Sequence, residues 1–342
     1  MKYPKFTDGC HSLLCKFLTK EVFEELKDRK TSNGFTLSKA INSGVVNEDS
    51  GIGVYAGDEE SYTLFAPLFD PIIKEYHGFG TDDMHVSNFD PKDLDISNPD
   101  PEGKFILSTR IRVGRNLADF PLGTIISKTQ RDKVESLVSD TLKSLKGELK
   151  GSYYPLKGMS KDVKEILIKD HFLFKEGDRF LEAAGLNRDW PDGRGIYHND
   201  DKTFLVWINE EDELRIISMQ QGGDIKEVFT RLSKAVTLIE QKASFMKTKH
   251  LGYITSCPTN LGTAMRASVH IKLPILSRKM DIFEEIIKEN HLQIRGIHGE
   301  HSQDESGIFD ISNKRRLGIN EVQCAYDLFN GVKKLIEKES SL

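Results

Sequence analysis

The sequence predicts an α+β protein: a small all-helical N-terminal domain, residues 1–90, and a larger domain, residues 91–342, with an antiparallel β-sheet flanked by α-helices. Three observations support this. Apolar residues early in the chain repeat at helical spacing. Later strands return through hairpins and alternate with long helices. Between these parts, the segment 77–103 is rich in Gly, Asp, Asn and Pro, as linkers are.

Apolar spacing predicts the N-terminal helices. The repeating residues are Leu13, Leu14, Phe17, Leu18, Val22, Phe23 and Leu26, followed by Leu37, Ala40 and Ile41. Asp70-Pro71 is typical of a helix N-cap followed by proline at the first helical position. We therefore expect the last helix of this domain to begin at Pro71 and to continue through Tyr76.

Period-two patterns predict the strands of the larger domain. In Phe105–Val113 the alternation places Ser108, Arg110 and Arg112 on one face. A capping box, Ser127-x-x-Gln130, opens a helix. The remaining expected elements are a hairpin of 203–208 and 214–219, a helix after Asp224, strands at 252–255, 266–273, 292–295 and 307–311, and a final helix at 320–337.

Composition narrows the class of protein. The 342 residues carry a net charge of −5 and are 38% hydrophobic and 30% charged, which is typical of a globular protein and not of a general nucleic-acid binder. The four cysteines show no metal-ligand spacing, so we expect reduced thiols and no structural metal. Neither a secretory h-region nor a membrane-length apolar run is evident, so we expect a cytoplasmic protein without a membrane partner.

One glycine pattern resembles a dinucleotide fingerprint. Gly51-Ile-Gly53-Val-Tyr-Ala56 fits G-x-G-x-x-A, but the preceding residues 47–50 are polar where that motif needs an apolar strand. A loop whose backbone amides approach a ligand explains the glycines better. The sequence has no Walker A motif, so any phosphate must be bound by side chains.

Five arginines lie on predicted strands. A single arginine on a strand is usually a charge that faces solvent. Five that converge on one sheet face would repel one another unless a polyanion such as a triphosphate neutralised them. They are Arg110, Arg112, Arg215, Arg266 and Arg295.

Three further segments contain candidate catalytic residues. Cys257 stands at a strand end, where packing is its usual role, although hydroxyls at Ser256 and Thr259 would lower the pKa of a thiol that they hydrogen-bond. The carboxylates at 210 and 211 lie at a hairpin tip, where solvation is usual. Glu300 stands in a loop with glycines at both ends, which suits a mobile lid.

Five motifs in register make the sequence resemble the phosphagen kinases, the ATP:guanidino phosphotransferases. They are Ser108-Thr-Arg-Ile-Arg112, Asn209-Glu-Glu-Asp, Cys257-Pro-Thr-Asn-Leu-Gly-Thr, Arg266-Ala-Ser-Val-His270 and Asp310-Ile-Ser-Asn-Lys-Arg-Arg316. The resemblance covers the chain from about residue 10 to its C-terminus. It implies a small helical domain followed by a larger one with an antiparallel sheet, in agreement with the periodicity.

The resemblance also implies roles for individual residues. Glu211, Glu300 and Cys257 would hold the guanidinium of the phosphate acceptor, with Cys257 as a thiolate. Asp49 and Arg179 would pair across the domains on closure. The loop over the amino-acid end of the substrate would be Ser50, Gly51, Ile52, Gly53, Val54 and Tyr55. The nucleotide site would comprise Ser108, Thr109, Arg110, Ile111, Arg112, His171, Arg215, Arg266, Ala267, Ser268, Val269, His270, Arg295, Gly296, Ile297, His298, Gly299 and Glu300.

The implied reaction is reversible transfer of the γ-phosphoryl group of ATP to the guanidino group of L-arginine, by a monomer, with Mg²⁺ held through the nucleotide. In the family that the sequence resembles, a short specificity loop goes with a large substrate and creatine kinases have an aliphatic residue at the position of Glu300, so the resemblance, with the short segment 42–53, implies arginine and not creatine. His298 departs from the family, which usually has arginine at this position, and the change weakens the charge of the lid near the phosphates or its internal salt bridges. Two alternatives remain: a kinase of taurocyamine or a similar guanidine, and a catalytically silent nucleotide-binding paralogue.

Overall fold

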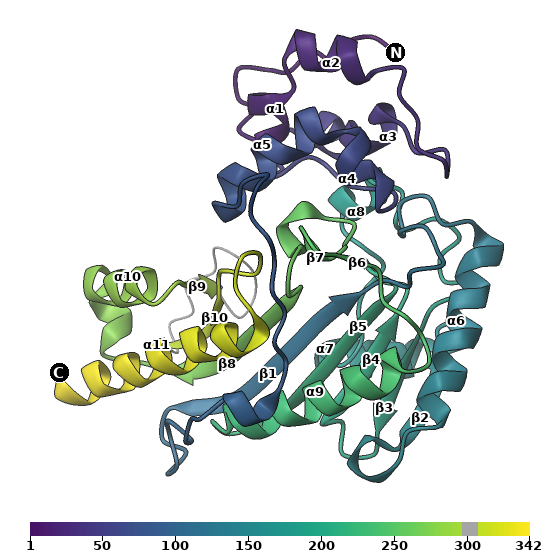
Figure 1. The fold of residues 1–342 in the computed structure, drawn as a ribbon. Coiled ribbons are helices and arrows are strands. Elements are labelled where there is room, and N and C mark those ends of the chain that lie inside the picture. Colours follow the sequence, from purple (N-terminus) through teal and green to yellow (C-terminus); the bar gives the residue numbers. More distant parts are fainter. Residues whose placement is uncertain (296–306) are drawn as a thin grey trace.

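The computed structural model describes residues 1–295 and 307–342. Five helices form the N-terminal region, which lies above one end of the large sheet in Figure 1. Thr19 caps the second helix by accepting a hydrogen bond from the amide of Val22, as expected of a threonine N-cap. The five helices are α1 (Leu13–Phe17), α2 (Lys20–Leu26), α3 (Leu37–Val46), α4 (Glu60–Leu64) and α5 (Ala66–His77).

The predicted start of the last N-terminal helix was wrong. Helix α5 begins at Ala66, with a proline in its first turn, and Pro71 lies inside it. An internal proline removes one backbone hydrogen bond. The helix nevertheless continues because its apolar face, which includes Phe69 and Ile72, is fully buried. Packing of that face therefore outweighs the local preference of Asp70-Pro71.

An eight-stranded antiparallel sheet forms the centre of the larger region (Figure 1). Its strand order is β2-β3-β4-β5-β1-β8-β10-β9, and β6 with β7 forms a separate pair. The predicted hairpin is present as β4 and β5. The strands are β1 (Ile106–Arg115), β2 (Gly151–Pro155), β3 (Gly195–Asn199), β4 (Phe204–Ile208), β5 (Leu214–Gln221), β6 (Lys247–Thr248), β7 (Gly252–Tyr253), β8 (Met265–Lys272), β9 (Leu292–Arg295) and β10 (Ile308–Asn313).

Long helices cover the apolar face of the sheet. Helix α9 packs on β1 and β5, and α11 packs on β8 and β10. The predicted capping box of Ser127 and Gln130 opens α6, and Asp224 caps α9. Side chains from these helices and from the strands form the main hydrophobic core. The helices of this region are α6 (Lys128–Lys143), α7 (Lys161–Lys169), α8 (Arg179–Ala183), α9 (Ile225–Glu240), α10 (Met280–Glu289) and α11 (Glu321–Ser341).

Strand β1 passes through the middle of the sheet, and its alternation is interrupted once. Ile106 is buried and Leu107 is exposed, the reverse of the predicted pattern. The pairing with β8 shifts register between Ile106 and Ser108, and such an irregularity changes the face on which the preceding side chains lie. From Thr109 onward the predicted alternation holds.

The interval between α5 and β1 contains the 3₁₀ turn Pro91–Asp93 as its only helix or strand. The expected domain boundary at residue 90 falls in this interval and stays a prediction. No helix among the described residues is long and apolar enough to cross a membrane.

The expectation that all four cysteines are reduced was wrong. Cys10 and Cys15 form a disulfide, whereas Cys257 and Cys324 are free and buried. Sequence spacing gave no sign of this bond, because a four-residue gap matches no common cysteine motif. Folding brings both sulfur atoms close to the Ser12 hydroxyl, at the start of α1.

Candidate active site

The predicted arginines gather on the face of the sheet opposite the main core. Arg112 of β1 lies directly opposite Arg266 of β8, and Arg110 lies opposite Ser268 on the same strand pair. Arg215 of β5 pairs with Gly114, two residues along β1 from Arg112, and therefore shares its face. Four of the five arginines thus come from three adjacent strands.

The face extends across the neighbouring strands. Ser108 lies opposite His270, which in turn lies opposite Asp310 of β10. Asp310 is also the register partner of Arg295 on β9, and it accepts an ion pair of 2.7 Å from Arg266. Alternation therefore brings all five arginines, together with Ser108, His270 and Asp310, to one surface, which we call the arginine face.

The arginine side chains on this face repel one another. Burial, together with the charges of Arg266 and Arg215, lowers the pKa of Arg110 to about 10. Burial and the same two neighbours also hold the pKa of Arg112 well below its usual value. A surface that disfavours its own positive charges gains stability when an anion binds.

Aromatic and backbone groups position two of these arginines. The Trp207 ring lies 5.4 Å from the Arg110 guanidinium and 5.8 Å from that of Arg215, within cation–π range. Arg110 Nη1 also donates to the carbonyl oxygen of His171 at 3.4 Å. His171 thus borders the arginine face, as its predicted role in the nucleotide site requires.

Four residues in the predicted nucleotide set point away from this face. Their side chains lie in the main core, because alternate residues of a strand face opposite sides of the sheet. Only their backbone can border a ligand on the arginine face. They are Thr109, Ile111, Ala267 and Val269.

The hairpin between β4 and β5 carries two carboxylates that are half-buried and paired. Arg215 forms ion pairs of 2.8 Å with Glu210 and 3.0 Å with Glu211. The usual expectation that carboxylates at a hairpin tip are solvated is therefore wrong for both glutamates. Burial raises the pKa of Glu211 to about 7, although Arg215 opposes this shift. A carboxylate near neutrality is suited to general-base chemistry.

Cys257 lies close to these carboxylates. Asn260, three residues further along, donates to Glu211 Oε1 at 3.3 Å. Thr259 Oγ1 lies 3.1 Å from Cys257 Sγ, as expected, whereas the Ser256 hydroxyl donates to the Glu211 carbonyl. Burial and the charge of Glu211 raise the pKa of Cys257 to about 12, which favours the thiol in the unliganded protein, and the expected thiolate stays a prediction.

The predicted substrate loop, residues 50–55, lies close to Cys257 and Glu211. The amide of Ala56 donates to the Ser256 carbonyl at 2.8 Å, next to Cys257. Tyr55 is buried, and burial together with the charges of Cys257 and Glu211 raises the pKa of its hydroxyl. The structure therefore brings the predicted substrate loop, the thiol and Glu211 together.

The start of that loop contacts the larger region through an ion pair. Arg179 Nη1 donates to Asp49 Oδ1 at 2.8 Å and to Asn47 Oδ1 at 3.1 Å. Both members of the Asp49–Arg179 pair are exposed. Within the loop, Ser50 Oγ accepts from the amide of Gly53 at 3.0 Å.

Sequence reasoning missed several residues of the site and could not place others. Asp310 and Arg316 stand in a motif that was noticed but given no role, and Arg316 donates to the Thr259 carbonyl at 3.1 Å. Trp207 and Asn260 carried no signal of their own. Five predicted residues, Gly296, Ile297, His298, Gly299 and Glu300, lie outside the described residues.

Family models match both parts of the chain. The ATP:guanido phosphotransferase N-terminal domain matches residues 8–74, and its C-terminal catalytic domain matches residues 133–342. The chain belongs to the ATP:guanido phosphotransferase family. This phosphagen kinase is therefore a phosphotransferase enzyme. The acidic hairpin and Arg215, Arg266 and Arg295 of the arginine face lie within the match to the catalytic domain, whereas β1, with Arg110 and Arg112, precedes it.

Similar proteins act on different guanidines. An arginine kinase of Penaeus vannamei is 57% identical over 335 residues, which are 97% of this chain and 94% of the relative. An arginine kinase of Anthopleura japonica is 56% identical over 96% of this chain, which spans 47% of that protein. The duplicated taurocyamine kinase of Schistosoma mansoni, solved with transition-state-analogue components, has a TM-score of 0.91 at 44% identity, over 97% of this chain and 46% of its own. A lombricine kinase has a TM-score of 0.93 at 38% identity, over 99% and 94% of the two chains.

Proposed function

We propose that this phosphagen kinase transfers the γ-phosphoryl group of ATP reversibly to the guanidino group of L-arginine, giving phosphoarginine and ADP. The main support for this proposal is the ion pair of 3.0 Å between Arg215 and Glu211, which joins the arginine face to the acidic hairpin. The curated arginine kinases at 56–57% identity support the choice of arginine. The product would buffer ATP in the cytoplasm, and the enzyme would act as a monomer.

The arginine face would hold the phosphates. Guanidinium groups match phosphate oxygens with two parallel hydrogen bonds, and phosphoryl transfer is mainly positioning and electrostatic stabilisation. Arg112, Arg266 and Arg110 repel one another in the free protein, so a polyanion relieves an existing cost when it binds. Ser108, His270 and His171 border that face.

Glu211 would prepare the acceptor. A guanidinium is almost always protonated and is a poor nucleophile until it loses a proton. Glu211, whose pKa burial raises to about 7, is positioned to orient one nitrogen and to take that proton. Cys257 would contact the neighbouring nitrogen, and Glu300 would supply the second carboxylate.

The loop 49–55 would recognise the amino-acid end of the substrate. Its Ser50, Gly51, Ile52, Gly53 and Val54 amides are candidate donors to a carboxylate, and Tyr55, whose hydroxyl pKa is raised by burial and by the charges of Cys257 and Glu211, would contribute a hydroxyl. The backbone contact of Ala56 with Ser256 would fix the distance between the two ends of the bound amino acid.

Magnesium would reach the site with the nucleotide. In residues 1–295 and 307–342 no three His, Cys, Asp or Glu side chains are grouped to hold a metal ion. The arginine face is suited to phosphate oxygens and not to a cation, so the fit is to a metal coordinated by the nucleotide and water. Such a metal supplies charge neutralisation on the phosphates.

Two other functions compete with this one. The fold similarity to a taurocyamine kinase favours another guanidine, because the scaffold of the site is shared. A silent nucleotide-binding paralogue would keep the arginine face but need no acidic hairpin beside the thiol. The paired, half-buried Glu210 and Glu211 favour an active enzyme over that alternative.

A coupled assay of ADP release tests the proposal. The purified chain is supplied with MgATP and, separately, arginine, creatine, glycocyamine, taurocyamine or lombricine. Arginine is expected to give the highest kcat/KM. A preference for another guanidine would overturn the substrate and keep the chemistry, whereas ADP binding without turnover of any guanidine would favour the silent paralogue.

A further inference from the structure

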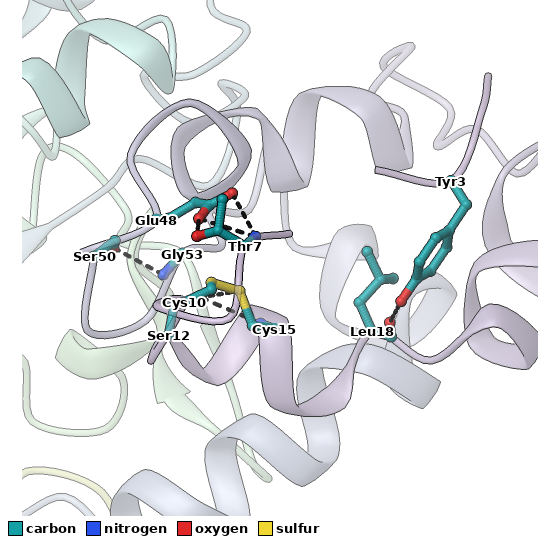
Figure 2. The surroundings of a disulfide bond; sticks show 9 residues. All are labelled: Tyr3, Thr7, Cys10, Ser12, Cys15, Leu18, Glu48, Ser50 and Gly53. Carbon is teal, nitrogen blue, oxygen red and sulfur yellow. Dashed lines mark hydrogen bonds between the residues drawn. A yellow bond between two sulfur atoms is a disulfide. The ribbon is translucent and has the colours of Figure 1, made fainter. Parts of the chain in front are cut away.

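The N-terminal disulfide lies beside the substrate loop. It joins Cys10 to Cys15, at the start of α1, and both residues are half-buried and therefore open to a reductant in solution. The Ser12 hydroxyl contacts both sulfur atoms. It is 3.5 Å from Cys10 Sγ and 3.2 Å from Cys15 Sγ, and it also caps α1 by accepting from the Cys15 amide (Figure 2).

The residues enclosed by the disulfide hold the substrate loop through their backbone. The amide of Leu13 donates to the Gly51 carbonyl at 3.1 Å, and the amide of Leu14 donates to the Ile52 carbonyl at 3.0 Å. Gly53 has a φ of +78°, and a Cβ there would lie 2.8 Å from Leu14 and 3.2 Å from the Ser12 hydroxyl. The loop is therefore packed directly against the disulfide-closed turn.

A second contact ties the segment before the disulfide to the start of the same loop. The backbone amide of Thr7 donates to both carboxylate oxygens of Glu48 at 3.2 Å (Figure 2). The amide of Cys10 donates to the Thr7 carbonyl at 3.1 Å. The disulfide is thus a covalent cross-link, in addition to the backbone, between this segment and α1. Leu14 of α1 is fully buried in the N-terminal core.

We propose that the Cys10–Cys15 disulfide is a redox-modification site that positions the substrate loop, so that a dithiol reductant weakens binding of the guanidino substrate and leaves nucleotide binding unchanged. This inference rests on the proposed role of residues 49–55 in substrate binding. The arginine face lies on the sheet of the larger region, and its contacts through Arg266 to Asp310 and through Arg110 to His171 lie within that region.

The chemistry is thiol–disulfide exchange. A thiolate of the dithiol attacks one sulfur atom and forms a mixed disulfide, and the second thiol of the reagent then displaces the remaining cysteine. The Sγ–Sγ bond breaks, each cysteine receives one proton from the dithiol, and the reagent becomes a cyclic disulfide. Two thiols cannot occupy the positions of two bonded sulfur atoms, so Cys10 and Cys15 move apart and Ser12 moves with them.

The test compares oxidised and dithiothreitol-treated full-length protein. Before treatment, two of the four cysteines should titrate as thiols in denaturant. Reduction should raise the KM for L-arginine about three- to tenfold, the equivalent of losing one backbone hydrogen bond, and leave the Kd of ADP unchanged. Hydrogen exchange at the Leu13 and Leu14 amides should become faster.

Two variants serve as controls. Cys10→Ser/Cys15→Ser should have the raised KM without reductant and should not respond to it. Cys324→Ala, which removes a buried thiol of the larger region, should keep the full response.

Four titratable thiols in untreated protein, or identical exchange and KM in both forms, would overturn the inference. Faster exchange without phosphorylation of any guanidine would support the redox link to the loop and overturn the proposed function instead. The two failures are therefore distinguishable.

Discussion

Arg112 of β1 and Arg266 of β8 lie directly opposite each other in the register of the sheet. Arg266 has an ion pair with Asp310, whereas Arg112 has no ion-pair partner among residues 1–295 and 307–342. Like charges in this position destabilise a strand pair. The free enzyme therefore carries a cost at the point where a triphosphate would bind.

The first prediction concerns this arginine pair. Arg112→Gln should stabilise the unliganded protein by about 0.5 kcal/mol, because one of two opposed charges is removed. The same change should weaken ADP binding about tenfold, through loss of a charged hydrogen bond. Thermal unfolding and ADP titration measure the two effects. The exposed Arg278→Gln is the matched control, and a destabilised Arg112→Gln protein that binds ADP normally would contradict the account.

The second prediction concerns the acidic hairpin. Glu211→Gln should lower kcat at least about 100-fold, because the amide cannot accept the proton of the guanidinium. The Kd of ADP should stay within about threefold of the original value, since Arg215 keeps its pair with Glu210. Initial rates and ADP titration separate the two effects. An equal loss of nucleotide binding would place Glu211 in the nucleotide site instead.

The third prediction is the pH dependence of phosphoarginine formation. Burial raises the pKa of Glu211 to about 7, and only its carboxylate form can accept a proton. The rate kcat/KM should therefore fall about tenfold for each pH unit below about 7. A pH series in a buffer of constant ionic strength measures this. A profile that is flat through this range would show that another group is the base.

The fourth prediction concerns Glu213, a buried carboxyl that does not belong to the proposed reaction. Its Oε2 accepts from the Leu117 amide at 2.6 Å, and its Oε1 has no hydrogen-bond partner among the described residues. Burial raises its pKa to about 8, so the folded protein keeps a proton that the unfolded chain loses above about pH 4.3. This group therefore lowers stability as the pH rises to about 8, and no further above it.

Glu213→Gln removes that ionisation. Its stability relative to the original protein should rise by roughly 2–3 kcal/mol between about pH 6 and about pH 9. Urea unfolding at the two pH values gives the difference. Glu165→Gln, at an exposed position of α7, should show no such trend. A constant difference for Glu213→Gln would mean that its carboxyl is ionised in the folded protein at both pH values.

The fifth prediction concerns the Asp49–Arg179 pair between the substrate loop and α8. Asp49→Arg should raise the KM for arginine, because two like charges then repel at the contact. The double variant Asp49→Arg/Arg179→Asp should recover most of the original value. Steady-state kinetics measure the KM for arginine. Small-angle scattering of the protein with both nucleotide and arginine bound measures whether the two regions stay in contact. The original KM in both variants would show that the pair has no part in substrate binding.

Much of the fold followed from local patterns. Alternation in Phe105–Val113 correctly placed Arg110 and Arg112 on one face, and the capping box at Ser127 correctly opened α6. The start of α5 was missed, because burial of Phe69 and Ile72 overrode the turn preference of Asp70-Pro71. The Ile106–Leu107 reversal depends on a register shift against β8, which no single-strand pattern contains.

The site was predictable in its residue types and less so in its charges. Opposed positions such as Arg112 and Arg266 depend on strand register, and the raised pKa of Cys257 depends on the depth of its burial. Neither property is encoded locally. The Cys10–Cys15 disulfide was missed for the same reason, since it requires the turn at Ser12.

Phosphorus NMR of the reaction products tests the central claim most directly. The enzyme is mixed with MgATP and L-arginine, and the resonance of a phosphorus–nitrogen bond is followed with that of ADP. The account predicts that the two appear together and in equal amounts, and that Glu211→Gln gives neither at a comparable rate. ADP formed with inorganic phosphate alone, or a phosphorylated product only with a guanidine other than arginine, would contradict it.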